Sequence, residues 1–218
     1  FVNTQSGNIT GAIWQYTLKN ELDHIQNKIT YYNYTSYYYY IPSSLREVVI
    51  TNAEKLSSAA FNGCTMLTSI TLNEGITAIY DRIGGQAFTN CSQITSFTMQ
   101  GVVTRIGAQA FDGCLNLIRI NSEVDGKIVL QEGLTSVGNY AFRNLGKITE
   151  VVIPNSVTSI GTGAFQGCNS LIRMTLPFVG RSRTATAYDA VFGYIFGYTT
   201  YISSDSFRGA EISTSFVN

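Results

Sequence analysis

Five short stretches of the chain alternate apolar and polar residues. They cover residues 67–72, 94–99, 117–122, 148–153 and 171–176. An alternation with a period of two predicts strands that bury one face. A second, shorter apolar pair, such as Val157 and Ile160, precedes the later stretches and is usually followed by Gly. We expect that pair to form a corner of the chain.

An internal repeat connects these stretches. Five Ala-Phe pairs recur, and the steps from Phe to Phe are 27, 23, 31 and 23 residues. Aligning the units on this Phe brings apolar, Gly and Cys positions into register. A period in the twenties predicts a solenoid in which each unit covers the apolar face of its neighbour. The expected fold is therefore a repeat solenoid of short parallel β-strands, joined by corner turns and single helical turns.

Two columns of the alignment predict the interior. The repeated Phe rings should fill the core, and a Cys follows three residues later in four units. A column shared by the units is typical of packing rather than of a ligand set, so we expect buried thiols that act as small apolar residues. Disulfides between neighbouring units, such as Cys64 with Cys91, are the alternative. The predicted core residues are Phe61, Phe88, Phe111, Phe142, Phe165, Cys64, Cys91, Cys114 and Cys168.

Turns and insertions can also be placed from the alignment. Gly or Asn stands two residues after each Phe, which predicts a positive φ there. Five residues before the Phe, Ile83 aligns with Leu56 and Ile106 as a corner residue. The two long steps carry about four extra residues near 77–81 and about eight near 123–131. We expect both insertions to lie in surface loops.

The chain divides into three predicted parts. Residues 41–177 form the solenoid of about five units, and residues 1–40 form an N-terminal capping helix and a Tyr-rich segment. Residues 178–218 form a spacer and a degenerate terminal unit, in which Ile202, Phe207 and Gly209 match the repeat. The helix is predicted over residues 11–28 by apolar residues at steps of 4, 4, 3 and 4. These residues are Trp14, Leu18, Leu22, Ile25 and Ile29.

The repeat resembles the BspA-type leucine-rich repeats of bacterial surface proteins. The resemblance is carried by residues 153–171, Ile-Pro-Asn-Ser-Val-Thr-Ser-Ile-Gly-Thr-Gly-Ala-Phe-Gln-Gly-Cys-Asn-Ser-Leu, and by Ile-Arg-Met-Thr-Leu-Pro after them. It covers about residues 41–177. It implies a leucine-rich-repeat-like fold in an exported, extracellular or cell-surface module that binds a host or matrix protein, or another cell. Glycans are a further partner class, and a structural spacer without its own ligand is the alternative function.

Composition and charge disfavour other classes of function. The 14 basic and 14 acidic residues balance, whereas nucleic-acid binding needs a surplus of basic residues. No apolar run approaches the length of a membrane span, and any signal peptide is expected outside this sequence. The single histidine, His24, leaves a nucleophile without a conventional base, and the acids are scattered over the units. We therefore expect no catalytic site, no metal site and no cofactor.

Two surfaces remain as candidate binding sites. The outward strand position eight residues after each Phe forms one line on the sheet face: Ser69, Ser96, Arg119, Glu150 and Arg173. The line is interpreted either as a polar recognition strip or as a solvated ladder of ion pairs. The second candidate is an aromatic patch of Tyr37, Tyr38, Tyr39 and Tyr40. These rings could bind sugars or a protein, or they could pack over the first unit.

Overall fold

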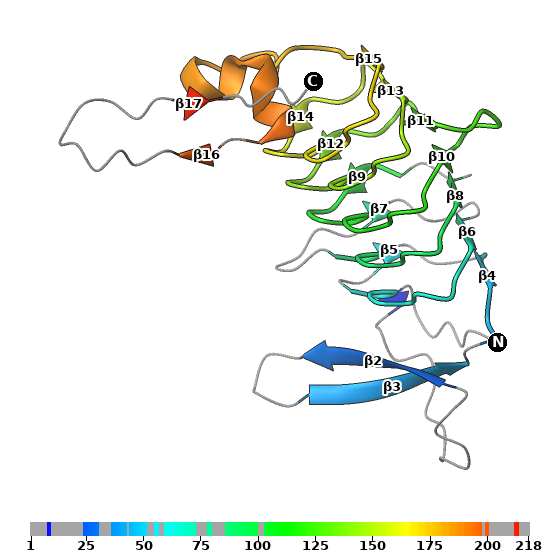
Figure 1. Ribbon diagram of the computed structural model, residues 1–218. Helices are drawn as coiled ribbons and strands as arrows, with labels where there is room; N and C mark the ends of the chain where they lie inside the picture. Colours follow the sequence, from blue (N-terminus) through cyan, green and yellow to red (C-terminus); the bar gives the residue numbers. More distant parts are fainter. Residues whose placement is uncertain are drawn as a thin grey trace.

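The protein is a solenoid with two parallel sheets along its length (Figure 1). The computed structural model describes residues 8–9, 24–30, 36–42, 44–51, 55–56, 59–72, 78–79, 86–99, 103–197, 199–200 and 212–213. Each unit contributes one strand to the second sheet and at least one strand to the first, and successive units stack as rungs. This arrangement confirms the predicted solenoid of parallel strands.

The seven-stranded sheet contains the predicted alternating stretches. Its order is β15-β13-β11-β10-β8-β6-β4. Residues that alternate with the outward positions point into the core, as in β6 and β8. The strands are β4 (Glu47–Ile50), β6 (Ser69–Leu72), β8 (Ser96–Met99), β10 (Arg119–Ile120), β11 (Lys127–Val129), β13 (Glu150–Val152) and β15 (Arg173–Thr175).

Four of the predicted corners lie in the second, six-stranded sheet. Two-residue strands pair in parallel in the order β1-β5-β7-β9-β12-β14. They are β1 (Asn8–Ile9), β5 (Lys55–Leu56), β7 (Ala78–Ile79), β9 (Arg105–Ile106), β12 (Ser136–Val137) and β14 (Ser159–Ile160). The second apolar pair therefore belongs to a sheet and is more than a bend of the chain.

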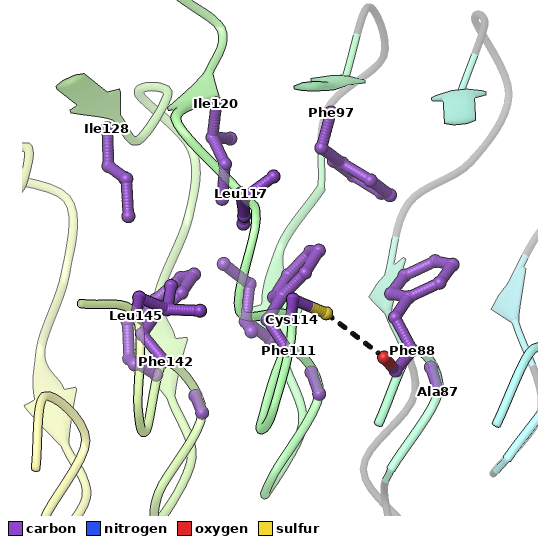
Figure 2. Packing of buried hydrophobic residues seen from close by; sticks show 14 of the residues in the cluster. Ala87, Phe88, Phe97, Phe111, Cys114, Leu117, Ile120, Ile128, Phe142 and Leu145 are labelled. Atoms are coloured by element: carbon purple, nitrogen blue, oxygen red, sulfur yellow. Dashed lines mark hydrogen bonds between the residues drawn. The ribbon is translucent and has the colours of Figure 1, made fainter. Parts of the chain in front are cut away.

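The repeated Phe rings stack through the core from rung to rung (Figure 2). Ring centroids of consecutive units lie 5.2–5.5 Å apart, and the ring planes are within 24° of parallel. Phe97 from β8 packs edge-on against two of these rings, Phe88 and Phe111. All five repeated rings are at most 4% exposed, so each rung buries the face of the next.

The Ala-Phe segments are consecutive β-turns and contain no helical turn, which corrects the sequence expectation. Around Phe111, for example, Asp112 N–H donates to the Gln109 carbonyl and Cys114 N–H to the Phe111 carbonyl. The intervening N–H groups bond to the next rung, where Phe111 N–H donates to the Ala141 carbonyl at 2.8 Å. Half of the backbone N–H groups of the turn thus donate to the next rung, whereas in a helix they would donate within the segment.

Two columns of the turns have positive φ. The predicted column, two residues after each Phe, has φ between 60° and 75° in all five units. A second column, two residues before the Phe, was not predicted. Its residues have φ between 36° and 59°, and they are Ala59, Gln86, Gln109, Tyr140 and Gly163.

The insertion near residues 123–131 is a strand in addition to a loop, so its placement entirely in a surface loop is wrong. Residues 127–129 form β11, which lies between β10 and β13 in the seven-stranded sheet. The chain turns back after Ile120 and returns one strand further along the sheet. This unit therefore adds two strands to one sheet and one strand to the other.

The alignment of the second unit is also corrected. Ile79 on β7 pairs with Leu56 on β5 and with Ile106 on β9, in the place that was assigned to Ile83. Part of the insertion expected at 77–81 is therefore strand. Ile83 and the rest of residues 80–85 lie outside the described residues.

The N-terminal part differs from the predicted helix. Residues 24–28 belong to β2 (His24–Thr30), which pairs antiparallel with β3 (Ser36–Pro42). The helix predicted over 11–28 is therefore wrong for its last five residues, and residues 11–23 lie outside the described residues. The apolar pattern there includes Ile25 and Ile29, which are four residues apart and so share one face of a strand as well as of a helix.

The C-terminal part covers the last rung (Figure 1). The 3₁₀ helices η2 (Ala187–Ala190) and η3 (Phe192–Phe196) belong to a segment whose carbonyls continue the ladder. Phe165 N–H donates to the Ile195 carbonyl at 2.9 Å, and Ile160 N–H donates to the Arg181 carbonyl at 2.8 Å. Beyond it, β16 (Thr199–Thr200) pairs antiparallel with β17 (Ile212–Ser213), and the expected unit at 202–210 lies outside the described residues.

Candidate interaction surface

The five predicted outward residues lie in one line across the seven-stranded sheet. Strand register places Ser69 beside Ser96, Ser96 beside Arg119, and Glu150 beside Arg173. Lys127 on β11 stands between Arg119 and Glu150, so those two are not neighbours. Sequence reasoning missed Lys127, because residues 127–129 lie inside the insertion that breaks the alignment.

The charged side chains on this line pair locally. Lys127 Nζ lies 3.1 Å from Glu150 Oε1, and Arg119 donates to Asp125 Oδ1 at 2.6 Å. Asp125 lies in the turn before β11, so the inserted segment supplies a partner to each strand beside it. These side chains are partly exposed, and such pairs contribute about 0–1 kcal/mol each to stability.

The residues two positions further along each strand form a second outward line on the sheet face. Their side chains differ between the two halves of the sheet. On β6 and β8 the outward residues of both lines are small and hydroxylated: Ser69, Thr71, Ser96 and Thr98. On β11 and β13 the second line is apolar, with the partly exposed Val129 and Val152 beside the Lys127–Glu150 pair. This second half combines apolar area and charge in the way that protein recognition surfaces do.

Threonine hydroxyls along the edges of both sheets reinforce the stacking. Thr135 Oγ1 donates to the Thr104 carbonyl at 2.8 Å, and Thr158 Oγ1 donates to the Thr135 carbonyl at 3.0 Å. In the seven-stranded sheet, Thr68 Oγ1 donates to the Arg46 carbonyl at 3.1 Å. These hydroxyls therefore have a structural role, which the sequence analysis did not identify.

The structure separates the predicted aromatic patch from the sheet face. Tyr37–Tyr40 lie on β3, in a two-stranded sheet of their own with β2. The backbone of Tyr38 is opposite Lys28, and that of Tyr40 is opposite Gln26. Their side chains lie outside what the structure describes, so the choice between a binding platform and a cover for the first rung stays a prediction.

The four cysteines are buried free thiols. Cys91, Cys114 and Cys168 each donate from Sγ to the carbonyl of the repeated Phe one rung earlier, at 2.9–3.2 Å. Figure 2 shows this bond between Cys114 and Phe88. Burial raises the pKa of the Cys64, Cys114 and Cys168 thiols to about 12 and raises that of Cys91 as well.

One charged cluster at the turns was missed from the sequence. Asp112 is 6% exposed and accepts hydrogen bonds from Arg143 Nε at 2.9 Å and from Asn144 Nδ2 at 3.3 Å. The Arg143 guanidinium also lies 5.0 Å from the centre of the Tyr140 ring. The hydrogen bond to Asp112 raises the pKa of Arg143, so this residue is a fixed cation. Asp112 and Arg143 share one alignment column, which could have predicted their contact.

In the described part of the chain, the His, Cys, Asp and Glu side chains form no group of three or more that could hold a metal ion. Its helices include none that is long and apolar enough to span a membrane.

Comparison with known proteins identifies the repeat. The sequence profile of the BspA type leucine rich repeat region matches six copies in this chain, over residues 33–124, 81–192 and 126–215. No curated protein is significantly similar in sequence.

Two solved structures resemble this solenoid. A leucine-rich repeat protein from Bacteroides ovatus is 26% identical over 75% of this chain and 42% of its own length, with a TM-score of 0.53. The leucine rich repeat protein of T. pallidum is 21% identical over 72% of this chain and 81% of its own, with a TM-score of 0.51. This chain therefore spans less than half of the Bacteroides ovatus protein.

Proposed function

Because this chain belongs to the BspA-type leucine-rich repeat family, we propose that it is a non-catalytic binding module of a cell-surface or secreted protein. Its partner is a protein, such as a host or matrix protein or a component of another cell surface. The binding site is the outer face of the seven-stranded sheet. Extended surfaces of stacked repeats are suited to holding a partner along several units.

The division of the sheet face carries this proposal. Val129 and Val152 place partly exposed apolar side chains on adjacent strands, next to the Lys127–Glu150 ion pair. A protein partner gains from burying such valines, while the surrounding charges favour one orientation over others. The inserted strand β11 brings Val129 and Lys127 to this face, so the insertion defines the site. Glycans fit less well, because no aromatic ring stands among the described outward residues of these strands.

A binding screen tests the proposal. The protein is applied to immobilised matrix proteins and glycans, and each binder is measured again with Val152→Arg. Ser159→Arg is the matched control, since Ser159 is an intermediate-exposure residue on the six-stranded sheet. A reduction of binding by Val152→Arg alone supports the face. The combined change of Arg119, Glu150 and Arg173 to Ala then measures what the charges contribute.

A structural spacer is the second candidate function. The half of the face on β6 and β8 carries only small hydroxylated residues, which offer little area to a partner. A spacer would hold other parts of a longer protein at a distance through the continuous ladder of rungs. A screen that yields no binder, together with wild-type behaviour of the Val152→Arg variant, would favour this function.

A further inference from the structure

Within the part of the chain that the structure describes, the seven-stranded sheet ends at β15 with an open edge. On one side β15 pairs with β13, and among the described strands none lies on its other side. The C-terminal segment that covers the last rung contacts the other half of that rung, through Arg181 next to Ile160 and Ile195 next to Phe165. Figure 1 shows β15 and this segment at the same end of the stack.

The side chains of this last strand lack the cover that their counterparts have. Ile148, Val151 and Ile153 in the preceding unit are at most 2% exposed. The equivalent residues of the last unit, Leu171, Met174 and Leu176, are only partly buried. One further strand would complete their burial, as β15 does for the unit before.

The backbone of β15 is set to receive that strand. Arg173 N–H donates to the Thr149 carbonyl, and the Thr175 carbonyl accepts from Ile153 N–H, so residues 173 and 175 face β13. Because backbone groups alternate in direction along a strand, the N–H and C=O of Met174 face the open side. Unpaired groups at a sheet edge are a template for strand addition.

The inner neighbour of β15 indicates which sequence fits. On β13, Glu150 lies opposite Arg173 and Val151 opposite Met174. Glu150 is already paired with Lys127, and within the described chain Arg173 has no ion-pair partner. The same Glu-Val-Val-Ile sequence occurs at residues 47–50 and 150–153. An added strand with an acidic residue opposite Arg173 would supply the missing charge.

We infer that the open edge of β15 binds an extended acidic-apolar segment of a partner protein as a parallel eighth strand. The acidic side chain pairs with Arg173 on the outer face. The apolar residue that follows the acidic residue in the added segment covers the Met174 side chain. The backbone of the added segment bonds to the N–H and C=O of Met174. This site is the edge of the sheet; it shares Arg173 with the face proposed above but does not include Val129 or Val152.

A peptide with the sequence of residues 44–51, Ser-Leu-Arg-Glu-Val-Val-Ile-Thr, is the probe. Binding is followed by amide chemical shifts in the NMR spectrum of the full chain. The expected result is a shift confined to Ile172, Met174, Leu176 and their neighbours. Arg173→Glu should weaken binding of this peptide at least about tenfold. A second peptide, with Lys in place of its Glu, should bind the Arg173→Glu protein more tightly than it binds the wild-type protein.

Matched variants separate this site from others. Lys147→Glu makes the same charge change at an exposed residue away from the edge and should leave peptide binding unchanged. Val152→Arg tests the sheet face, so failure of one site is distinguishable from failure of the other. No shift at about 1 mM peptide would overturn the inference, as would shifts located elsewhere. Protection of the Met174 amide from hydrogen exchange in the free chain would also overturn it, because the edge would already be covered.

Discussion

The side-chain amide of Asn121 bonds to the backbone of Met99 in the place of a peptide group. Asn121 Oδ1 accepts from Met99 N–H at 2.7 Å, and its Nδ2 donates to the Val129 carbonyl at 3.3 Å. β10 ends at Ile120, since Asn121 has a φ of 48° and leaves the sheet. The amide therefore joins β8 to β11 where the strand between them is missing, and Gln131 Nε2 donates to the Met99 carbonyl.

Replacing Asn121 tests this bridge. Asn121→Ala should lower the free energy of unfolding by about 1–3 kcal/mol, because it leaves Met99 N–H and the Val129 carbonyl without their partner. Asn121→Gly is the control, since Gly accepts the positive φ and removes only the amide. Chemical denaturation measures both. A variant Asn121→Gly as stable as the wild type would show that backbone conformation, and not the bridge, selects Asn here.

Truncating a ring of the Phe stack should destabilise the whole solenoid. Phe111 contacts the rings of Phe88, Phe97 and Phe142, so Phe111→Ala leaves a cavity between three rungs. The expected loss is about 3–5 kcal/mol in denaturant unfolding. Phe111→Leu keeps most of the volume and should lose less. Equal losses from the two variants would contradict the role of the ring stack.

The periodic part of this fold could be predicted from the sequence, and the exceptions could not. Phe and Cys columns repeat because every rung presents the same environment to its neighbours. The positive φ before each Phe gave no signal, because Gln86, Gln109 and Tyr140 have no common conformational preference. β11 was missed because an insertion breaks the alignment, and a run of three residues is too short to show whether it joins a sheet. Because β11 was missed, Lys127 and Val129 were missed as well, and with Val129 the apolar part of the candidate surface was not predicted.

Buried thiols should make stability depend on alkaline pH. Burial raises the pKa of Cys114 to about 12, whereas an unfolded thiol has a pKa of about 8.5. A raised folded-state pKa contributes stability that is complete below the unfolded value and is lost as pH rises toward the folded value. The free energy of unfolding should therefore fall above about pH 8.5, by up to about 1.4 kcal/mol per pH unit for each thiol.

Unfolding measured from pH 7 to 9.5 checks this slope, and Cys114→Ala should flatten it by the share of one thiol. The range stops below the ordinary titration of tyrosine, at about pH 10. The same burial should protect all four thiols from alkylation until the protein unfolds. Rapid labelling of all four in the native protein would contradict their place in the core.

Glycines in one column allow adjacent rungs to approach closely, and this can be tested with a matched pair. A Cβ at Gly161 would collide with the backbone of Gly138 and Asn139 in the preceding rung. Gly161→Ala should therefore force the rungs apart and cost about 1–3 kcal/mol. Gly146 has no atom within 4 Å of such a Cβ and no positive φ, so Gly146→Ala should change stability by less than about 1 kcal/mol. Thermal and denaturant unfolding of both variants measure the difference. If Gly161→Ala and Gly146→Ala changed stability by similar amounts, close contact between the rungs would not require Gly in this column. The Gly column would then reflect chain flexibility.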